Sequence, residues 1–113
     1  MIDPPAADWD VEERREAVMR ALGSVWDPEL GLDIISLGLV YDVRVDDTSV
    51  EVDMTLTTPG CPVSEQLPAQ AEDAVRYAVP DRDVRVNVVW DPPWTPERIS
   101  PVALERLGYV RRR

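Results

Sequence analysis

Two neighbouring runs of the sequence alternate between apolar and polar residues, and this alternation constrains the fold more than any other feature. It covers residues 42–46 and 50–57, where the apolar members are Val43, Val45, Val50, Val52, Met54 and Leu56. Successive side chains of a β-strand point to opposite faces, so both runs predict strands with one buried side and one solvent-facing side. The polar Asp47-Thr48-Ser49 between them predicts a hairpin, whose apolar face needs a cover.

Two helical segments flank this hairpin. Asp10-Val11-Glu12-Glu13 has the pattern of a capping box, and apolar residues then follow at helical spacing, so residues 11–22 predict a helix with Gly23 at the C′ position. A second apolar stripe runs from Val63 to Ala78 and stops before Pro80. Pro68 falls inside this stripe, and we expect it either to kink the helix or to shift its regular start.

The remaining segments complete the order α-β-β-α-β-α. Val84, Val86 and Val88 alternate with polar residues and predict a third strand. Ser100-Pro101 has the pattern of an N-cap followed by the first helical residue, and Gly108 that of a C′ residue. Residues 24–38 contain a proline and two glycines, which argue against a regular element, but their apolar content predicts a packed and often functional loop.

The composition places the chain in a narrow class. With 113 residues, of which 44% are hydrophobic, we expect one α+β domain over 1–113 with a core at about 11–108. No apolar run is long enough to span a bilayer, and residues 1–5 do not resemble a secretory signal, so we expect a cytoplasmic protein without membrane partners. The net charge of −10 argues against binding to nucleic acid.

The chain has no histidine and one cysteine, Cys61. This excludes a histidine-dependent catalytic triad or dyad, an intrachain disulfide, and a four-cysteine metal site within one chain. A metal or cluster held by thiolates would therefore need Cys61 from two chains, or ligands from a partner. A thiol enzyme that lacks both histidine and a second cysteine is the weakest hypothesis, and we expect no catalytic activity.

Cys61 lies in the segment Thr57-Thr58-Pro59-Gly60-Cys61-Pro62, between a predicted strand and a predicted helix. A helix N-terminus favours a thiolate, which is both the nucleophilic form of cysteine and its metal-binding form. The alternative is a buried structural cysteine, since free cysteines are often buried. A strand-to-helix turn is a more frequent place for a site than for a core residue, and this favours the functional interpretation.

Two further segments carry unusual chemistry. Asp27 and Glu29 flank Pro28, and their carboxylates are hard donors suited to iron, although capping a turn or pairing with arginine is the more common use. Trp90-Asp91-Pro92-Pro93-Trp94 places two tryptophans on a corner stiffened by proline. Such a corner either covers the edge of a core or presents an aromatic surface to a partner, and the sequence leaves both alternatives open.

Taken together, three segments resemble the iron–sulfur cluster assembly family, also called metal–sulfur cluster biosynthetic proteins. They are Asp27-Pro28-Glu29 leading into residues 33–43, Thr57–Pro62, and Val88–Trp94 followed by Ser100 and Leu107-Gly108. The likeness spans about residues 11–108. PaaD-like members continue into a cysteine-rich segment that is missing from this sequence, so we expect the SufT-like branch.

The resemblance implies a mixed sheet packed on helices and a role in delivering iron–sulfur clusters to apo-proteins. It also implies that Cys61 is the key thiol, with Asp27 and Glu29 nearby. Such a carrier would hold a labile cluster or iron between two subunits of a homodimer. The alternatives are a PaaD-like component that matures an oxygenase, or an adaptor that binds no cluster. The adaptor would dock the assembly machinery onto clients through the Trp90–Trp94 corner and residues 26–39.

Overall fold

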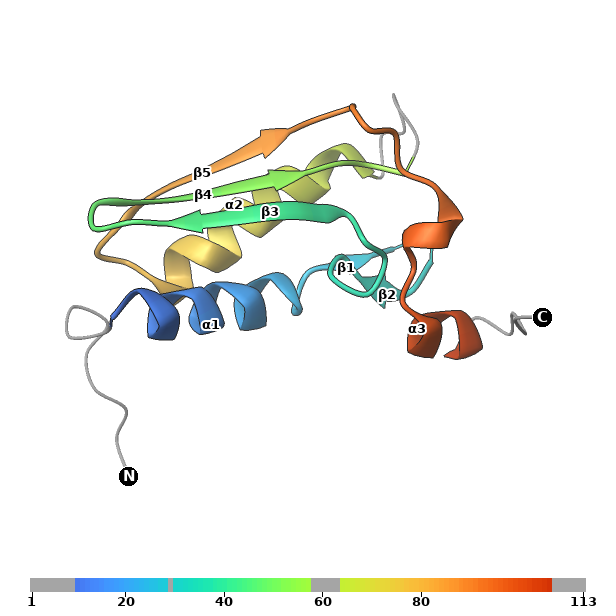
Figure 1. Ribbon diagram of the computed structural model, residues 1–113, viewed down its shortest axis with the longest axis horizontal. Coiled ribbons are helices and arrows are strands. Elements are labelled where there is room, and N and C mark those ends of the chain that lie inside the picture. Colours follow the sequence, from blue (N-terminus) through green and yellow to red (C-terminus); the bar gives the residue numbers. More distant parts are fainter. Residues whose placement is uncertain (1–9, 29, 58–63, 107–113) are drawn as a thin grey trace.

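The computed structural model describes residues 10–28, 30–57 and 64–106, and Figure 1 shows how its elements are arranged. In chain order they are α1 (Val11–Leu22), β1 (Trp26–Asp27), β2 (Leu32–Asp33), β3 (Val40–Val45), β4 (Ser49–Met54), the 3-10 turn η2 (Ser64–Gln66), α2 (Leu67–Ala78), β5 (Asp83–Val88), the 3-10 turn η3 (Pro96–Arg98) and α3 (Pro101–Arg106). The α+β class and the order α-β-β-α-β-α are thereby confirmed. The short strands β1 and β2 and the two 3-10 turns are additions to it.

The main sheet has the strand order β3-β4-β5, and it is mixed, as the resemblance implies. β3 and β4 are antiparallel, whereas β4 and β5 are parallel and are joined through α2. The helices α1 and α2 pack on each other and cover one face of the sheet (Figure 1). The core lies between these two layers, where the predicted apolar positions Val50, Val52 and Met54 are fully buried.

The helix boundaries follow the local chemistry of the sequence. The predicted capping box is present, because the Asp10 carboxylate accepts a hydrogen bond from the backbone N–H of Glu13 at 2.8 Å and the Glu13 side chain accepts one from the Asp10 N–H. Gly23 is the C-cap itself, with a right-handed φ of −67°, and not the left-handed C′ residue that we expected. Pro68 shifts the start of α2, which begins at Leu67 and places the proline in its first turn.

The last helix also begins as predicted, since the Ser100 hydroxyl accepts a hydrogen bond from the N–H of Ala103 at 3.2 Å. The expected C′ residue, Gly108, lies outside the described residues.

The expectation that residues 24–38 contain no regular element is wrong in one respect. Trp26 and Asp27 pair with Leu32 and Asp33 in a two-residue antiparallel ladder, β1 with β2. The turn between them contains Pro28 and the left-handed Gly31, with a φ of +69°. Pro28 and Gly31 therefore form the turn of a small hairpin instead of preventing regular structure. The buried side chains of Leu32, Ile34 and Leu37 pack the connection onto the core, as expected.

Charged side chains tie distant parts of the chain together. The Arg14 side chain is only 2% exposed and binds the Asp81 carboxylate through two nitrogens, at 2.7 and 2.9 Å, which joins α1 to the α2–β5 turn. On the open face of the sheet, Arg44 binds Asp42 and Asp53. The hydrogen bonds from Arg44, and a further one from Asn87, lower the pKa of Asp53 to about 2.

Candidate functional site

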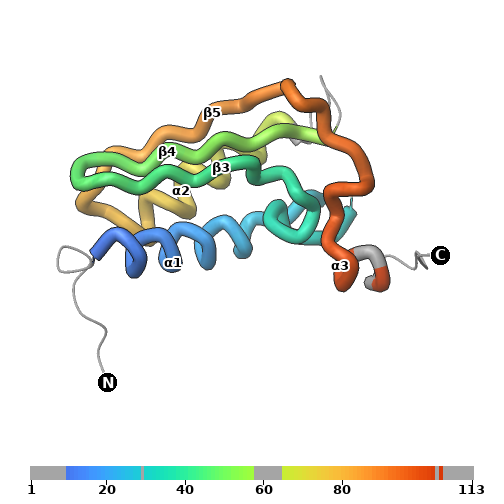
Figure 2. Tube along the Cα trace, in the orientation of Figure 1, coloured from blue at the N-terminus to red at the C-terminus, as the bar shows by residue number. Residues whose placement is uncertain are grey.

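The strands β4 and β5 are parallel, and their arrows in Figure 1 run toward the end of the molecule where the β1–β2 hairpin and η3 lie; Figure 2 shows the course of the chain in the same orientation. In open α/β arrangements, ligands bind beyond the carboxyl ends of parallel strands, on the loops that lead from strand to helix. The connection from β4 to α2 is such a loop, and in sequence it contains Thr58, Pro59, Gly60, Cys61 and Pro62. These five residues lie outside the described residues, and the residues that flank them in the chain and in space are described.

The tryptophan corner contacts the start of this connection. Leu56 and Thr57, the last described residues before the cysteine segment, line a shallow pocket of about 430 Å³ together with Trp90, Pro93 and Trp94. The structure therefore brings the predicted aromatic corner to the base of the predicted thiol segment. In the sequence these two features are some 30 residues apart, and no local pattern predicts a contact between them.

The two tryptophans of the corner differ in their environments. Trp94 is half-buried and packs against the core, and its indole N–H donates a hydrogen bond of 2.7 Å to the carbonyl of Leu37. Trp90 is 47% exposed at the rim of the pocket. Trp94 therefore covers the edge of the core, as one of the two alternatives has it, whereas a role of the exposed Trp90 in contacting a partner stays a prediction.

The corner and the segment after it are fixed to the start of β3 and to the connection before β3. The Tyr41 hydroxyl donates a hydrogen bond of 2.7 Å to the carbonyl of Pro92, and the Arg98 guanidinium stacks 4.6 Å from the centre of the Tyr41 ring. The N–H of Ser100 donates to the carbonyl of Ser36 at 2.8 Å. Tyr41 belongs to one of the three motif segments, but nothing in the sequence pointed to Arg98 as its partner.

Gly38 explains how closely these two segments approach each other. Its φ is +74°, and a Cβ atom at this position would lie 2.4 Å from the carbonyl oxygen of Arg98. Only glycine satisfies both the left-handed backbone and this close approach. The glycine of the Leu37-Gly38 pair in the motif therefore allows η3 and the corner to pack closely against the turn at residues 36–38.

Asp27 is 1% exposed and lies in the β1–β2 hairpin. One oxygen of its carboxylate accepts a hydrogen bond from the N–H of Leu30 at 3.1 Å, and its carbonyl accepts one from the N–H of Gly31 at 2.8 Å. This is the turn-stabilising use of an aspartate that the sequence left as an alternative. Pro28 is exposed on the same turn, while Glu29 lies outside the described residues. The predicted ligand role of Asp27 and Glu29 stays a prediction.

One buried polar group near this end was missed at the level of sequence. Thr55 follows β4 directly and is fully buried, and its hydroxyl has no hydrogen-bond partner among the described residues. Its N–H donates to the carbonyl of Leu39 at 2.8 Å, which extends the sheet beyond β4. A threonine in an alternating run gives no signal that its hydroxyl is buried.

Within the described parts of the chain, no three side chains of Cys, Asp or Glu come together as a set of metal ligands. Nor is any helix of those parts both long and apolar enough to cross a membrane.

Comparison with known proteins agrees with the motifs. Residues 15–88 match the family described as iron–sulfur cluster assembly protein, and the chain belongs to this family. It is 49% identical over 85 residues to the Fe-S protein maturation auxiliary factor SufT of Staphylococcus aureus, covering 74% of this chain and 97% of that protein. It is 42% identical over 98 residues to the Fe-S protein maturation auxiliary factor YitW of Bacillus subtilis, covering 86% and 96%.

The fold has a close counterpart among solved structures. The crystal structure of a domain of unknown function, DUF59, from Bacillus anthracis superposes with a TM-score of 0.78 at 41% identity. The match covers 86% of this chain and 93% of that one. The family expected from the three motif segments is thereby confirmed, as is its SufT-like character.

Proposed function

We propose that this protein is an accessory factor of iron–sulfur protein maturation that helps to deliver clusters to apo-proteins, with Cys61 as its key thiol. The observation that supports this most is the convergence of the motif segments. The tryptophan corner packs on the 36–38 turn through Trp94, and it shares a pocket with Thr57 at the base of the cysteine segment. Relatives that match nearly over their whole length are named maturation auxiliary factors.

Chain connectivity supports a place for Cys61 in this region. Cys61 follows Thr57 by four residues and precedes Ser64 by three, and an extended chain spans at most about 3.6 Å per residue, which keeps its Cα within roughly 14 Å of that of Thr57. Thr57 lines the pocket beside Trp90. We therefore place the thiol and the exposed indole on the same end of the molecule, where one client could contact both.

A single thiolate does not complete the coordination of iron in a cluster. The remaining ligands come from outside this chain: from a second copy, a small thiol or the client. Cys61 thus holds the cluster or iron loosely, and transfer is a ligand exchange in which a client thiolate replaces the Cys61 thiolate without a redox change. Glu29 and Asp27 are the acidic residues that we place near this site. The protein acts in this scheme as a single domain that holds and transfers its cargo without catalysis.

The test is anaerobic reconstitution with ferrous iron and sulfide, followed by visible absorbance, iron and sulfide analysis, and native mass. We expect cluster absorbance in the wild type and its loss in Cys61→Ser, with far-ultraviolet circular dichroism unchanged. Trp90→Phe is the matched control and should load like the wild type, because Trp90 has no donor role in coordination. A Cys61→Ser protein that loads fully, or supports maturation fully in cells, would exclude Cys61 as the key thiol.

The adaptor hypothesis is favoured by one separate observation. Trp26 and Trp90 are 51% and 47% exposed, and large exposed aromatic side chains often anchor protein contacts. If the adaptor hypothesis holds, the wild type retains no iron under conditions that load a known scaffold, and Trp90→Ala weakens binding to an assembly scaffold protein at least about tenfold. If binding to the scaffold is unchanged, the exposed tryptophans do not form its docking surface.

A further inference from the structure

The two edges of the main sheet differ in how their backbone groups are used. At the β3 edge, the side chain of Arg15 reaches from α1 and donates a hydrogen bond of 2.6 Å to the carbonyl of Val43. At the other edge, β5 pairs only with β4 among the described strands. An edge strand with unpaired N–H and C=O groups is a template for a further strand, and proteins usually block it.

The register shows which residues of β5 face outward. The N–H of Asp83 donates to the carbonyl of Thr48, and that of Val89 donates to Met54. Residues 83, 85, 87 and 89 therefore point their backbone groups toward β4, because the direction alternates along a strand. The N–H and C=O groups of Val84, Val86 and Val88 point away from the sheet, and none of them bonds to another described residue.

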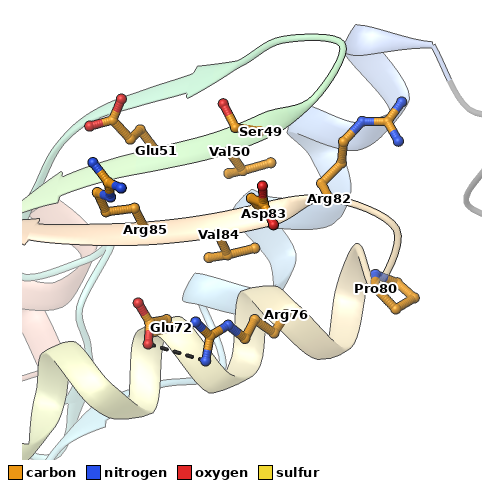
Figure 3. Close-up of a pocket in the computed structure, with 10 residues that line it drawn as sticks. All are labelled: Ser49, Val50, Glu51, Glu72, Arg76, Pro80, Arg82, Asp83, Val84 and Arg85. Atoms are coloured by element: carbon orange, nitrogen blue, oxygen red, sulfur yellow. Dashed lines mark ion pairs between the residues drawn. The ribbon is translucent and has the colours of Figure 1, made fainter.

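The side chains of β5 divide between the two faces of the sheet. Val84, Val86 and Val88 lie on the α2 side, with exposure rising from 7% at Val84 to 37% at Val88. Arg85 projects from the opposite face, beside Glu51, as Figure 3 shows for the end of β5 nearest Pro80. Arg85 forms no ion pair with any described residue. The open edge thus combines a row of valines on one side with an arginine on the other that no described carboxylate pairs.

We propose that two copies of the chain associate by pairing their β5 edges in antiparallel fashion, about a two-fold axis through Val86. In this register Val86 faces the partner's Val86, and Val84 faces the partner's Val88. The backbone groups of Val84, Val86 and Val88 all face outward, so each of these pairs exchanges two backbone hydrogen bonds. The half-exposed Val86 and Val88 gain β-branched neighbours across the ladder, a favourable cross-strand combination.

The polar side chains of β5 favour this register over the neighbouring one centred on Arg85. On the open face it places Arg85 opposite the partner's Asn87, whose amide nitrogen is already bound to Glu51 and Asp53, so its side-chain oxygen is available to accept from the guanidinium. A register centred one residue earlier would place Arg85 directly opposite the partner's Arg85. Like charges directly opposite each other destabilise a ladder, which argues against that alternative.

The difference between the two edges limits the assembly to two chains. Pairing β5 with the partner's β5 uses up both open edges and makes one six-stranded sheet. The outer edges of that sheet are then the two β3 strands, where α1 packs against the strand and the Arg15 side chain occupies the outward-facing carbonyl of Val43. A two-fold contact of this kind is closed, because neither partner offers a second copy of the same surface.

The proposed dimer has a consequence for the thiol site, although it does not rest on the proposed function. In an antiparallel pair the carboxyl ends of β4 and β5 point in opposite directions, and strands of six residues are about 20 Å long. The two Cys61 connections would then lie at opposite ends of the joined sheet. In this dimer the partner's Cys61 does not complete a cluster, so the missing ligands come from a small thiol or from the client.

Hydrogen exchange of the wild type, measured residue by residue with rising protein concentration alongside sedimentation velocity, tests the proposal. We expect the mass to rise from one chain to two. In parallel, exchange at the amides of Val84, Val86 and Val88 should slow by about tenfold or more once the dimer dominates. The amides of Arg85 and Asn87 face β4 and serve as internal controls that are protected at every concentration.

Two variants test the contact directly. Val86→Pro removes an N–H that bonds to nothing within the described chain, and Val88→Lys places a charge on the exposed edge; each should weaken the dimer at least about tenfold. Asp42→Ala on β3 is the matched control and should leave association unchanged. The proposal is overturned by a one-chain mass at every concentration, by a dimer that both variants retain, or by outward amides that slow only when another protein is added.

Discussion

Replacing three glycines by alanine, one at a time, would separate backbone strain from close packing in this fold. Gly23 has a right-handed φ of −67°, and its nearest neighbours would lie 3.5 Å from a Cβ atom. Gly31 has a φ of +69°, with nothing within 4 Å of that position. Gly38 has a φ of +74° and would place its Cβ 2.4 Å from the carbonyl oxygen of Arg98, and 2.9 Å from its carbonyl carbon.

The expected losses of unfolding free energy follow from these geometries. Gly23→Ala should be neutral or stabilising by up to about 1 kcal/mol, because only the unfolded chain loses freedom. Gly31→Ala should cost about 1–2 kcal/mol, the price of a left-handed conformation for a residue with a Cβ. Gly38→Ala adds an overpacking cost of about 1–3 kcal/mol, because the obstacle is backbone that must move, giving a total of about 2–5 kcal/mol.

Urea denaturation followed by circular dichroism measures all three differences, provided that the slope of each transition stays the same. A second readout is the intrinsic tryptophan emission, to which Trp94 contributes; it should change in Gly38→Ala because Arg98 and the corner move together, and should not change in Gly31→Ala. If Gly38→Ala and Gly31→Ala lose the same free energy, the close approach to Arg98 contributes nothing and the reasoning fails.

Single contacts in the fold can be tested one at a time. Trp94→Phe should lower stability by about 1–2 kcal/mol, through loss of the indole hydrogen bond, whereas Trp90→Phe should change it by less than about 0.5 kcal/mol; thermal and urea melts would show both. The lowered pKa of Asp53 stabilises the fold above about pH 4 and ceases to do so as the pH falls through 2, a contribution of at most about 2 kcal/mol given that Arg44 is partly exposed. Asp53→Asn should therefore flatten the dependence of unfolding free energy on pH between 5 and 2, and an unchanged slope would contradict the assignment. Arg15→Ala uncovers the β3 edge, so it should produce assemblies larger than a dimer in light scattering, whereas a mass of two chains would show that α1 alone protects that edge.

Local chemistry let the sequence predict most of the regular elements. The capping box at Asp10 and Glu13 sets the start of α1, and the alternating valines define β4 and β5, because these signals involve residues close together in the chain. The parallel pairing of β5 with β4 could not be read from alternation, which is the same for either direction. The mixed sheet was expected only from the family resemblance.

The site was predictable as a set of segments but not as an arrangement. Which tryptophan of the corner is buried depends on Leu37, 57 residues away in the chain, and no local pattern encodes that contact. The burial of Arg14 likewise depends on Asp81, at a separation of 67 residues. The hairpin at Asp27 was missed because a two-residue ladder is too short to show a period. The cysteine segment itself remains a prediction.

The distribution of the tryptophans gives this protein a built-in spectroscopic probe of one region. Of its four tryptophans, Trp26, Trp90 and Trp94 are described, and they belong to the connection before β3 and to the corner that packs on it; Trp9 lies outside the described residues. The emission of these three indoles therefore reports on that region, whereas circular dichroism reports on the helices and the sheet. If the two signals melt at different temperatures, that region opens as a separate cooperative unit. Because iron quenches nearby indoles, the same emission would follow cargo binding and release without any added dye.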